Sequence, residues 1–199
     1  MDIGVLGGTF DPIHIGHLII AEEARLRLGL SQVIFVPAGE SWFKYDREIS
    51  PAEHRLEIVK LAIATNPHFT VSTVDLDRGS PSYTVDTLAD LRRELGEAAD
   101  FYFILGLDAL VQFDMWREPR RIIEMCYLVA ARRPEAIHLD LASLERSIPG
   151  ISRRLIMLDN AQIGISSSEI REIVAKGFPI RNFVPDAVER YIREHGLYK

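Results

Sequence analysis

Between Gly4 and His17 the chain reads GVLGGTFDPIHIGH. An apolar run ends there in two glycines, and two histidines follow, three residues apart, where a helix is expected to begin. Because glycine has no Cβ, a strand that ends in Gly7 and Gly8 can bring bare backbone N–H groups close to an anion. The N-terminus of the next helix adds further N–H groups and the positive end of its dipole. The stretch therefore predicts a strand, an anion-binding turn and a helix.

The two imidazoles strengthen this interpretation. His14 and His17 are expected to project from one side of the first helical turn. An imidazole N–H can donate to a phosphate oxygen, and the cationic form is available near neutral pH. A Gly-Gly pair alone is usually only a turn, and a single histidine is more often structural than catalytic. Both features at the first strand-to-helix junction favour a cradle for a nucleotide polyphosphate.

Length and composition limit the class of protein. The 199 residues fit one domain, residues 1–199, on which a C-terminal helical part from about residue 166 to 199 is expected to pack. Hydrophobic residues make up 47% and charged residues 26% of the chain, which is typical of a folded globular protein. A net charge of −6 argues against nucleic acid and an anionic membrane surface as partners. An anionic substrate would therefore need a locally positive pocket.

Two features of the sequence bear on location. No apolar run approaches the length of a membrane span, and the N-terminus lacks the basic-then-apolar layout of a secretion signal. The only cysteine, Cys126, excludes an internal disulfide and a metal site made of several cysteines. Its apolar neighbours predict an inert buried thiol. A cytoplasmic location is the default expectation.

Apolar, β-prone runs alternate with helical patterns along the chain. Strands are expected at residues 2–6, 32–36, 70–74, 100–105, 127–131 and 155–158. Helices are expected at residues 16–28, 51–65, 85–95, 119–124, 167–176 and 185–194, with a further short helix around 140–147. Strands separated by helices predict βαβ units, and hence an α/β fold in which helices cover both faces of a mainly parallel sheet.

Polar clusters follow several of the predicted strands. In open parallel sheets, ligands bind beyond the carboxyl ends of the strands, near the point where the strand order reverses. The segments after strands one, four, five and six carry residues 7–17, 106–116, 132–133 and 165–171. Four clusters that are distant in sequence are therefore expected at one edge of one sheet.

The last of these clusters reads ISSSEIR, from Ile165 to Arg171. Ser166 and Glu169 have the spacing of a capping box, so a helix should begin here. A cap alone does not account for three adjacent hydroxyls with an arginine about one turn later. Hydroxyls, free N–H groups and a guanidinium together predict a second anion site.

Several of these motifs resemble boxes of a known family. GTFDPIHIGH, at residues 8–17, resembles the (G/T)xFDPxHxGH box of the HxGH nucleotidyltransferase superfamily, and more closely that of bacterial nicotinate-nucleotide adenylyltransferases. ISSSEIR is similar to their ISSTxIR box, and PSYTVDTL, at residues 81–88, to their PSYTxxTL segment. GLDAL, at residues 106–110, with Trp116 after it, resembles their GxDxL box and tryptophan, and the RRP that begins at Arg132 resembles their RRP. The resemblance spans nearly the whole chain.

This resemblance implies a Rossmann-like three-layer α/β/α fold of the HxGH type. It implies the transfer of AMP from ATP to nicotinate mononucleotide, which gives deamido-NAD and pyrophosphate. It places in ATP binding Gly7, Gly8, Thr9, Phe10, His14, His17, Gly106, Asp108, Arg132, Ser167, Ser168 and Arg171. The catalytic residues that it implies are His14, His17, Lys44 and Arg171. Mg²⁺ is expected to accompany ATP, held by substrate phosphates and water rather than by a protein cage.

The resemblance also implies a second set of residues, which would bind the nicotinate half of the substrate. These are Lys44, Tyr83, Thr84, Thr87 and Trp116. Thr84 and Thr87 are candidates for the carboxylate, and the indole of Trp116 can stack on a cationic pyridinium ring. Lys44 takes the place of the lysine in the family's PPHK element, although Ser41, Trp42 and Phe43 precede it here.

Two alternative functions remain open from the sequence. A pantetheine-phosphate adenylyltransferase shares the FDP and ISST boxes, but the PSYT segment and Trp116 favour nicotinate. A nucleotide-binding regulatory module that has lost turnover is disfavoured by the presence of both histidines, Lys44 and Arg171. The strength of the preference for the acid over nicotinamide mononucleotide stays open, because a hydroxyl pair serves either group. A homo-oligomer is also compatible with the sequence.

Overall fold

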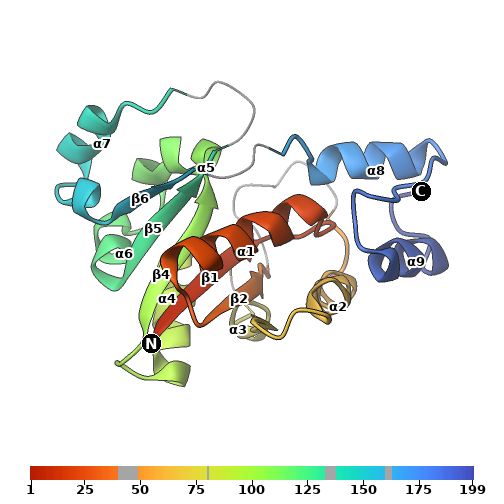
Figure 1. The fold of residues 1–199 in the computed structure, drawn as a ribbon, viewed down its shortest axis with the longest axis horizontal. Coiled ribbons are helices and arrows are strands. Elements are labelled where there is room, and N and C mark those ends of the chain that lie inside the picture. Colours follow the sequence, from red (N-terminus) through yellow and green to blue (C-terminus); the bar gives the residue numbers. More distant parts are fainter. Residues whose placement is uncertain (40–48, 80, 133–137, 160–162) are drawn as a thin grey trace.

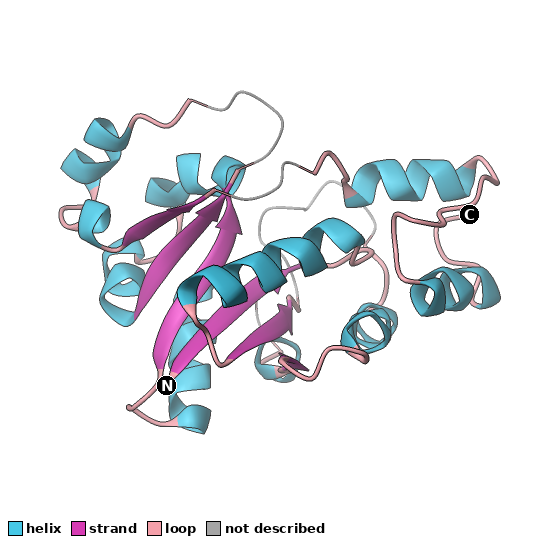
Figure 2. Ribbon diagram, in the orientation of Figure 1, coloured by secondary structure: helices cyan, strands magenta, loops and turns pink. Residues whose placement is uncertain are grey.

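The computed structural model describes residues 1–39, 49–79, 81–132, 138–159 and 163–199. Its centre is a six-stranded sheet in the order β3-β2-β1-β4-β5-β6, in which every neighbouring pair is parallel (Figure 2). The strands are β1 (Asp2–Gly8), β2 (Gln32–Pro37), β3 (Phe69–Val71), β4 (Asp100–Gly106), β5 (Cys126–Ala131) and β6 (Leu155–Leu158). This is the strand order of Rossmann-like sheets, which reverses between β1 and β4. The expected α/β fold is confirmed.

Helices cover both faces of the sheet. One face packs against α1 (Ile15–Leu28), α2 (Ala52–Ile63), α8 (Ser167–Ala175) and α9 (Asp186–Glu194). The other packs against α3 (Val74–Asp77), α4 (Thr84–Leu95), α5 (Leu107–Val111), α6 (Pro119–Met125) and α7 (Leu141–Ser147), with the short 3₁₀ helices η1 (Phe113–Met115) and η2 (Ile151–Arg153). In Figure 1, α1 crosses the front of the sheet. Helices α8 and α9 lie beyond the N-terminal end of α1, near the C-terminus of the chain.

The core consists of two apolar clusters, one on each side of the sheet. Along β4, Phe101, Phe103 and Leu105 belong to the cluster under α4 and α6, whereas Ile104 belongs to the cluster under α1 and α2. This alternation follows from the two-residue period of a strand. Because both faces are covered, the strands read as nearly continuous apolar runs rather than as alternating ones.

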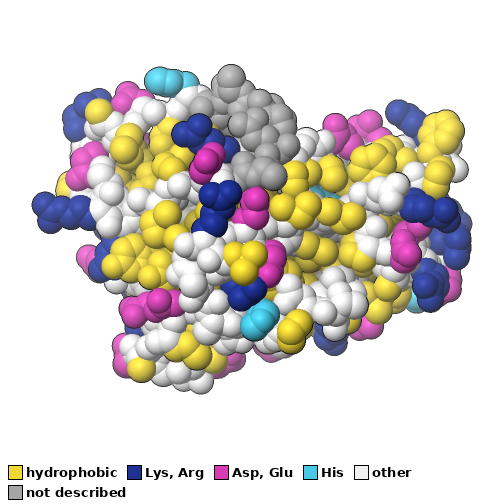
Figure 3. All heavy atoms as spheres, viewed as in Figure 1, with side chains coloured by type: hydrophobic (Ala, Val, Ile, Leu, Met, Phe, Trp, Pro, Cys, Tyr) yellow, Lys and Arg dark blue, Asp and Glu magenta, His cyan; other side chains and the backbone are white. Residues whose placement is uncertain are grey.

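The C-terminal helices share a core with the sheet. Ile170 of α8 and Val188 and Ile192 of α9 are buried in the same cluster as Val33 and Phe35 of β2. Figure 3 shows the α1 face, on which acidic and basic side chains are interspersed among apolar ones. In the parts of the chain that the structure describes, no helix combines the length and the apolar character that crossing a bilayer requires.

Some local predictions differ from the structure. The third strand was predicted to reach Val74, but β3 ends at Val71, and Val74 begins α3. The hydroxyl of Thr73 donates to Oδ2 of Asp77 at 2.6 Å, and this polar turn stops the strand. Residues 106–116, expected as a loop, contain α5 and η1. The short helix expected around 140–147 is confirmed as α7, whose cap Asp140 accepts from the backbone N–H of Ser143 at 2.9 Å.

Candidate active site

An opening lies between β1 and β4 at their carboxyl ends. The ladder that joins these strands ends at the pair Leu6 and Ile104, whereas β1 continues along β2 as far as Gly8. Gly7 and Gly8 are therefore the last residues of β1, as expected for a strand that ends in these glycines, although the predicted range stopped at residue 6. A cavity of about 490 Å³ opens at this point. Its volume lies in the range of small-molecule sites.

Most of the residues proposed from the sequence line this one cavity. They are Gly7, Gly8, Thr9, Phe10, His14, His17, Tyr83, Thr84, Thr87, Gly106, Asp108, Trp116, Ser167 and Ser168. Arg132 and Arg171 are not among the described residues that line it. Lys44, together with Arg133, lies outside the described residues. Three of the four expected clusters, residues 7–17, 106–116 and 165–171, therefore meet at this cavity, whereas Arg132 from the cluster after strand five does not line it.

The two histidines form a stacked pair at the start of α1. His14 precedes the helix as its N-cap, in extended backbone, so it does not project from the first turn as expected. Its backbone N–H donates to Nδ1 of His17 at 3.2 Å, and the two ring centroids are 3.7 Å apart. Gly16 permits this packing, because a Cβ there would lie 3.0 Å from Nδ1 of His14.

This hydrogen bond fixes the tautomer of His17. A ring nitrogen that accepts a hydrogen bond carries no proton, so a neutral His17 has its proton on Nε2. Protonation of Nδ1 would break the bond from the backbone N–H of His14. Of the two forms that the sequence left open, this hydrogen bond favours the neutral imidazole with its proton on Nε2.

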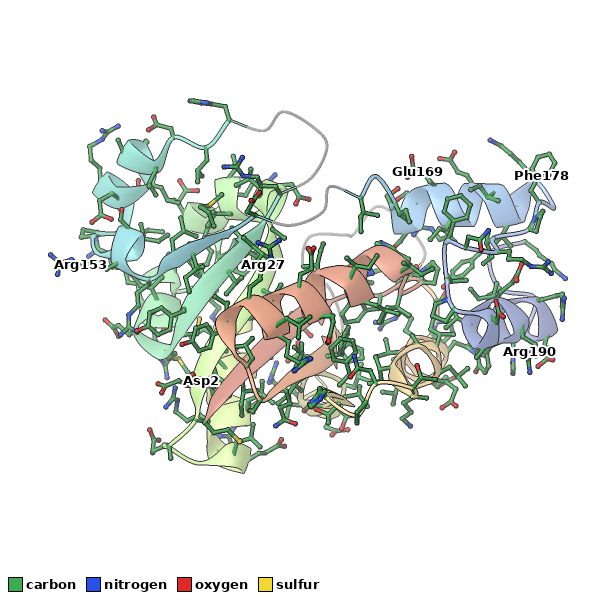
Figure 4. All side chains as sticks on the ribbon, viewed as in Figure 1. Asp2, Arg27, Arg153, Glu169, Phe178 and Arg190 are labelled. Atoms are coloured by element: carbon green, nitrogen blue, oxygen red, sulfur yellow. The ribbon has the colours of Figure 1, made fainter. Side chains whose placement is uncertain are left out.

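The serine motif begins α8 and meets the turn after β1. The expected capping box is present: Glu169 N–H donates to Ser166 Oγ at 3.2 Å, and Ser166 N–H donates to Glu169 Oε2 at 3.0 Å. Ser167 Oγ donates to the carbonyl oxygen of Pro12 at 2.9 Å. Figure 4 labels Glu169 at the start of α8 and Phe178 beyond its end, so the helix runs away from α1.

Arg171 links α8 to the same turn. Its Nη1 donates to the carbonyl oxygen of Asp11 at 2.6 Å, and its Nη2 donates to Ser168 Oγ at 3.0 Å. The guanidinium thus lies beside the turn that leads into the histidine pair, behind the cavity wall rather than in it. Direct hydrogen bonds therefore join the two motifs that the sequence predicted as anion sites. Arg171 and Asp11, which form one of these bonds, are 160 positions apart in the sequence.

The hydroxyl of Thr87 is committed to a buried carboxylate. Thr87 is 3% exposed, and its Oγ1 donates to Asp75 Oδ1 at 2.7 Å. Asp75 also accepts from Nη2 of Arg78 at 2.9 Å. Burial opposes the charge on Arg78, but its hydrogen bonds with Asp90 and Asp75 prevail and raise its pKa. The same Oγ1 lies 3.1 Å from the carbonyl oxygen of Tyr83, so the single hydrogen of the Thr87 hydroxyl has two acceptors within the protein.

An aromatic wall stands at the end of the cavity near α4. Trp116 is half-buried, with its ring nearly perpendicular to that of Phe103 at 6.0 Å. The guanidinium carbon of Arg117 lies over the ring of Tyr83, 4.7 Å from its centroid. Arg117, Asp75 and Ser82 line the cavity and were missed from the sequence. The only feature of the sequence that pointed to Arg117 was its position directly after Trp116.

Arg55 of α2, which was also missed from the sequence, connects the turns after β1 and β2. It is 2% exposed, and Nη1 donates to the carbonyl oxygens of Thr9 at 2.8 Å and Ala38 at 2.7 Å. Its Nε donates to the carbonyl oxygen of Ser50 at 2.9 Å. Burial lowers the pKa of Arg55, and the nearby charge of Asp11 partly offsets this. An arginine inside a helical pattern gave no sign of this role.

The remaining candidates follow β4 and β5. Gly106 is the N-cap of α5, and Asp108 is an exposed acid in the first turn of that helix, where the dipole favours a negative charge. Arg132 is exposed directly after β5. Within the described residues, no group of three or more histidine, cysteine or acidic side chains could hold a metal ion.

The fold and the site define a class of protein. Residues 5–173 match the cytidylyltransferase-like family, and the chain belongs to that family. A relative from Dehalococcoides mccartyi is 47% identical over 98% of this chain and 96% of its own length. A relative from Roseiflexus sp. is also 47% identical, over 99% of this chain and 98% of its own. Both carry the name "probable nicotinate-nucleotide adenylyltransferase".

A solved structure supports the fold independently. The nicotinic acid mononucleotide adenylyltransferase of Plasmodium falciparum, complexed with NaAD, is 20% identical to this chain. The similarity covers 99% of this chain and 97% of that one, with a TM-score of 0.80. Two sequences this different share an architecture over their whole length.

Proposed function

We propose that this protein is a nicotinate-nucleotide adenylyltransferase of NAD biosynthesis, which transfers AMP from ATP to nicotinate mononucleotide and releases pyrophosphate. The observation that carries the proposal is one cavity whose wall combines the Gly7-Gly8 strand end, the histidine pair and Trp116. The relatives that match nearly the whole chain point to the same activity.

The reaction requires no nucleophile from the protein. An oxygen of the 5′-phosphate of the mononucleotide attacks the α-phosphorus of ATP, and the bond from that phosphorus to the bridging oxygen breaks as pyrophosphate leaves. Both reactants are polyanions, so the enzyme must align them and stabilise the charge that moves onto the leaving group.

In this proposal the phosphates of ATP and of the mononucleotide bind at the end of the cavity formed by β1, α1 and α8. A Cβ at Gly8 would lie 3.2 Å from the ring of Phe10, so glycine there lets this ring pack against the strand end that lines the cavity. The Nε2–H of His17 supplies a neutral donor, because its Nδ1 is held by the backbone of His14. Ser167 and Arg171 hold the turn before His14, and Arg171 adds positive charge close behind it. Lys44 and Arg132 keep the roles that the resemblance implies for them, as proposals.

The nicotinate ring belongs at the opposite end, between α4 and Trp116. The indole face suits a cationic pyridinium, and the guanidinium of Arg117 beside it suits the carboxylate. Thr84 begins α4, whose free N–H groups add further donors. Because the hydroxyl of Thr87 already has Asp75 and the carbonyl oxygen of Tyr83 as acceptors, we assign Thr87 to shaping this end rather than to donating to the carboxylate of the substrate.

Mg²⁺ is part of the proposal as the ion that accompanies ATP. When bound, it would neutralise charge on the β- and γ-phosphates. The carboxylates that line the cavity, Asp11, Asp75 and Asp108, do not form a metal-binding group in the described part of the chain. We propose that substrate oxygens and water supply most of the ligands of this ion.

Further parts of the proposal concern organisation and location. We propose that residues 1–199 act as one domain, which the continuous core between the sheet and α8 and α9 supports. We also propose a cytoplasmic location, supported by the single buried cysteine. Cys126 is unreactive as a thiol, because burial raises its pKa to about 12.

The test is pyrophosphate release from ATP with each candidate acceptor in turn. We expect turnover with nicotinate mononucleotide, slower turnover with nicotinamide mononucleotide and none with pantetheine phosphate. Release with pantetheine phosphate alone would establish the alternative transferase. Binding of ATP without release in the presence of any acceptor would indicate a regulatory module.

A further inference from the structure

The end of the chain reaches the turn that precedes the histidine pair. The hydroxyl of Tyr198 donates to Oδ1 of Asp11 at 2.9 Å, although the two residues are 187 positions apart. Asp11 is 2% exposed and lines the cavity, three residues before His14. A donor on the C-terminal segment is thus bound to a buried carboxylate of the active-site wall.

Three more hydrogen bonds join the C-terminal part to this turn, but they act at the backbone. Ser167 and Arg171 donate to the carbonyl oxygens of Pro12 and Asp11, and the N–H of Ile15 donates to the carbonyl oxygen of Phe183 at 2.9 Å. The contact from Tyr198 differs because it reaches a side chain with a charged acceptor. Such hydrogen bonds are about twice as strong as neutral ones.

The turn itself needs outside support. Phe10 has a φ of 48°, in the left-handed region that residues other than glycine rarely adopt. Its neighbour Asp11 therefore connects a strained residue to the segment that ends in the histidine pair. A fixed side chain at Asp11 limits how far this segment can relax.

Tyr198 is suited to act as a permanent donor. Burial and the charge of Asp11 both raise its pKa well above the ordinary value, so the phenol stays protonated throughout the neutral range. Arg55 and Arg171 place positive charge near the pair. The contact is thus a neutral hydroxyl that donates to the side chain of Asp11 and also has the Ser50 side chain as a hydrogen-bond partner.

We propose that Tyr198 is a positioning residue of the active site, which holds Asp11 and thereby fixes residues 9–14 and the orientation of the histidine pair. This inference rests on the proposed function, because it assigns the histidines to the charge that develops as pyrophosphate leaves. A misplaced donor weakens transition-state stabilisation more than substrate binding. Loss of the hydroxyl should therefore lower kcat and leave KM nearly unchanged.

The test is the variant Tyr198→Phe, which keeps the ring and removes the hydroxyl. We expect kcat to fall about tenfold to a hundredfold, as displacements of about 1 Å in active sites do. The KM values for ATP and for the acceptor should stay within about twofold, because substrate contacts are retained. Circular dichroism at the assay temperature measures the folded fraction. A decrease in kcat no larger than the decrease in folded fraction would overturn the inference.

A matched control is Tyr191→Phe. The hydroxyl of Tyr191 bonds to Nδ1 of His54 at 2.9 Å, so this variant also removes a tyrosine hydroxyl from the C-terminal part but leaves Asp11 untouched. We expect wild-type kcat from it. An equal loss of kcat in both variants would mean that the C-terminal part contributes only through general stability, and would overturn the inference.

A double-mutant cycle with Asp11→Asn tests the route of the effect. If Tyr198 acts through Asp11, Tyr198→Phe should lower kcat much less in the Asp11→Asn background than in the wild type. Additive losses would contradict the inference. All variants are assayed with the acceptor that the wild type turns over. A wild type that is inactive with nicotinate mononucleotide would contradict the proposed function. The double-mutant cycle would still test the role of Tyr198 with another acceptor.

Discussion

The backbone N–H of His14 donates to Nδ1 of His17, and the rings of the two residues stack 3.7 Å apart. One nitrogen of His17 therefore holds the start of α1, and in the proposed function the other donates to a phosphate oxygen. The residue combines a structural and a chemical task, and substitutions can separate them.

Replacement of His17 by asparagine or glutamine should separate its two tasks, which are to hold the start of α1 through Nδ1 and to donate through Nε2. In His17→Asn the side-chain oxygen can replace Nδ1 as the acceptor, but no group reaches the position of Nε2. We expect a stable protein whose kcat is about a hundredfold to a thousandfold lower, the usual cost of losing one transition-state donor. His17→Gln should retain more kcat and melt at a lower temperature. Near-normal turnover of His17→Asn would remove Nε2 from the mechanism.

Trp116 should act on the acceptor and not on ATP. Removal of the indole in Trp116→Ala takes away a stacking face for the pyridinium, so we expect the KM for nicotinate mononucleotide to rise about tenfold. The KM for ATP should be unchanged. Initial rates with each substrate varied in turn separate the two constants, and Trp116→Phe should be intermediate. A change confined to ATP would refute stacking on the acceptor.

Arg117 should set the preference for the acid over the amide. In Arg117→Ala we expect the ratio of kcat/KM for nicotinate over nicotinamide mononucleotide to fall about threefold to tenfold, a modest effect because the side chain is half exposed. Arg117→Lys should retain part of the preference. Arg121 is a matched control, because it also pairs with Glu118, at 3.2 Å, but does not line the cavity. An equal effect of Arg121→Ala would mean that Arg117 influences the substrate preference only through its long-range positive charge, and not through contact with the carboxylate.

Glu145 should contribute to stability in a pH-dependent way. Hydrogen bonds from the Ser152 hydroxyl and from the N–H groups of Gly150 and Ser152 lower the pKa of Glu145 from 4.5 to about 2. A depressed pKa in the folded state stabilises the protein above the unfolded value, and this contribution is lost as the pH falls from 4.5 to about 2. Urea unfolding at several pH values should show a shallower acid dependence for Glu145→Gln than for the wild type. Parallel curves would contradict this assignment.

The sequence by itself determined the elements and their chemistry. Apolar runs broken by glycine and by capping residues located every strand of the sheet, because hydrophobic periodicity and turn chemistry are local properties. Gly7, the two histidines and the capping box of Ser166 and Glu169 were visible for the same reason. Short elements such as α3 and α5 were missed, since a few residues carry too little periodic signal.

Only the tertiary structure decided which groups meet and in what direction. Arg55 reads as an ordinary helical residue until its carbonyl partners on two separate turns are known. Arg171 bonds to Asp11, and Thr87 is directed at Asp75, through contacts that no local pattern encodes. Such contacts depend on how sheet and helices pack, because packing sets the distance between residues far apart in the chain. The bond between Tyr198 and Asp11, which joins the two ends of the sequence, is the clearest case.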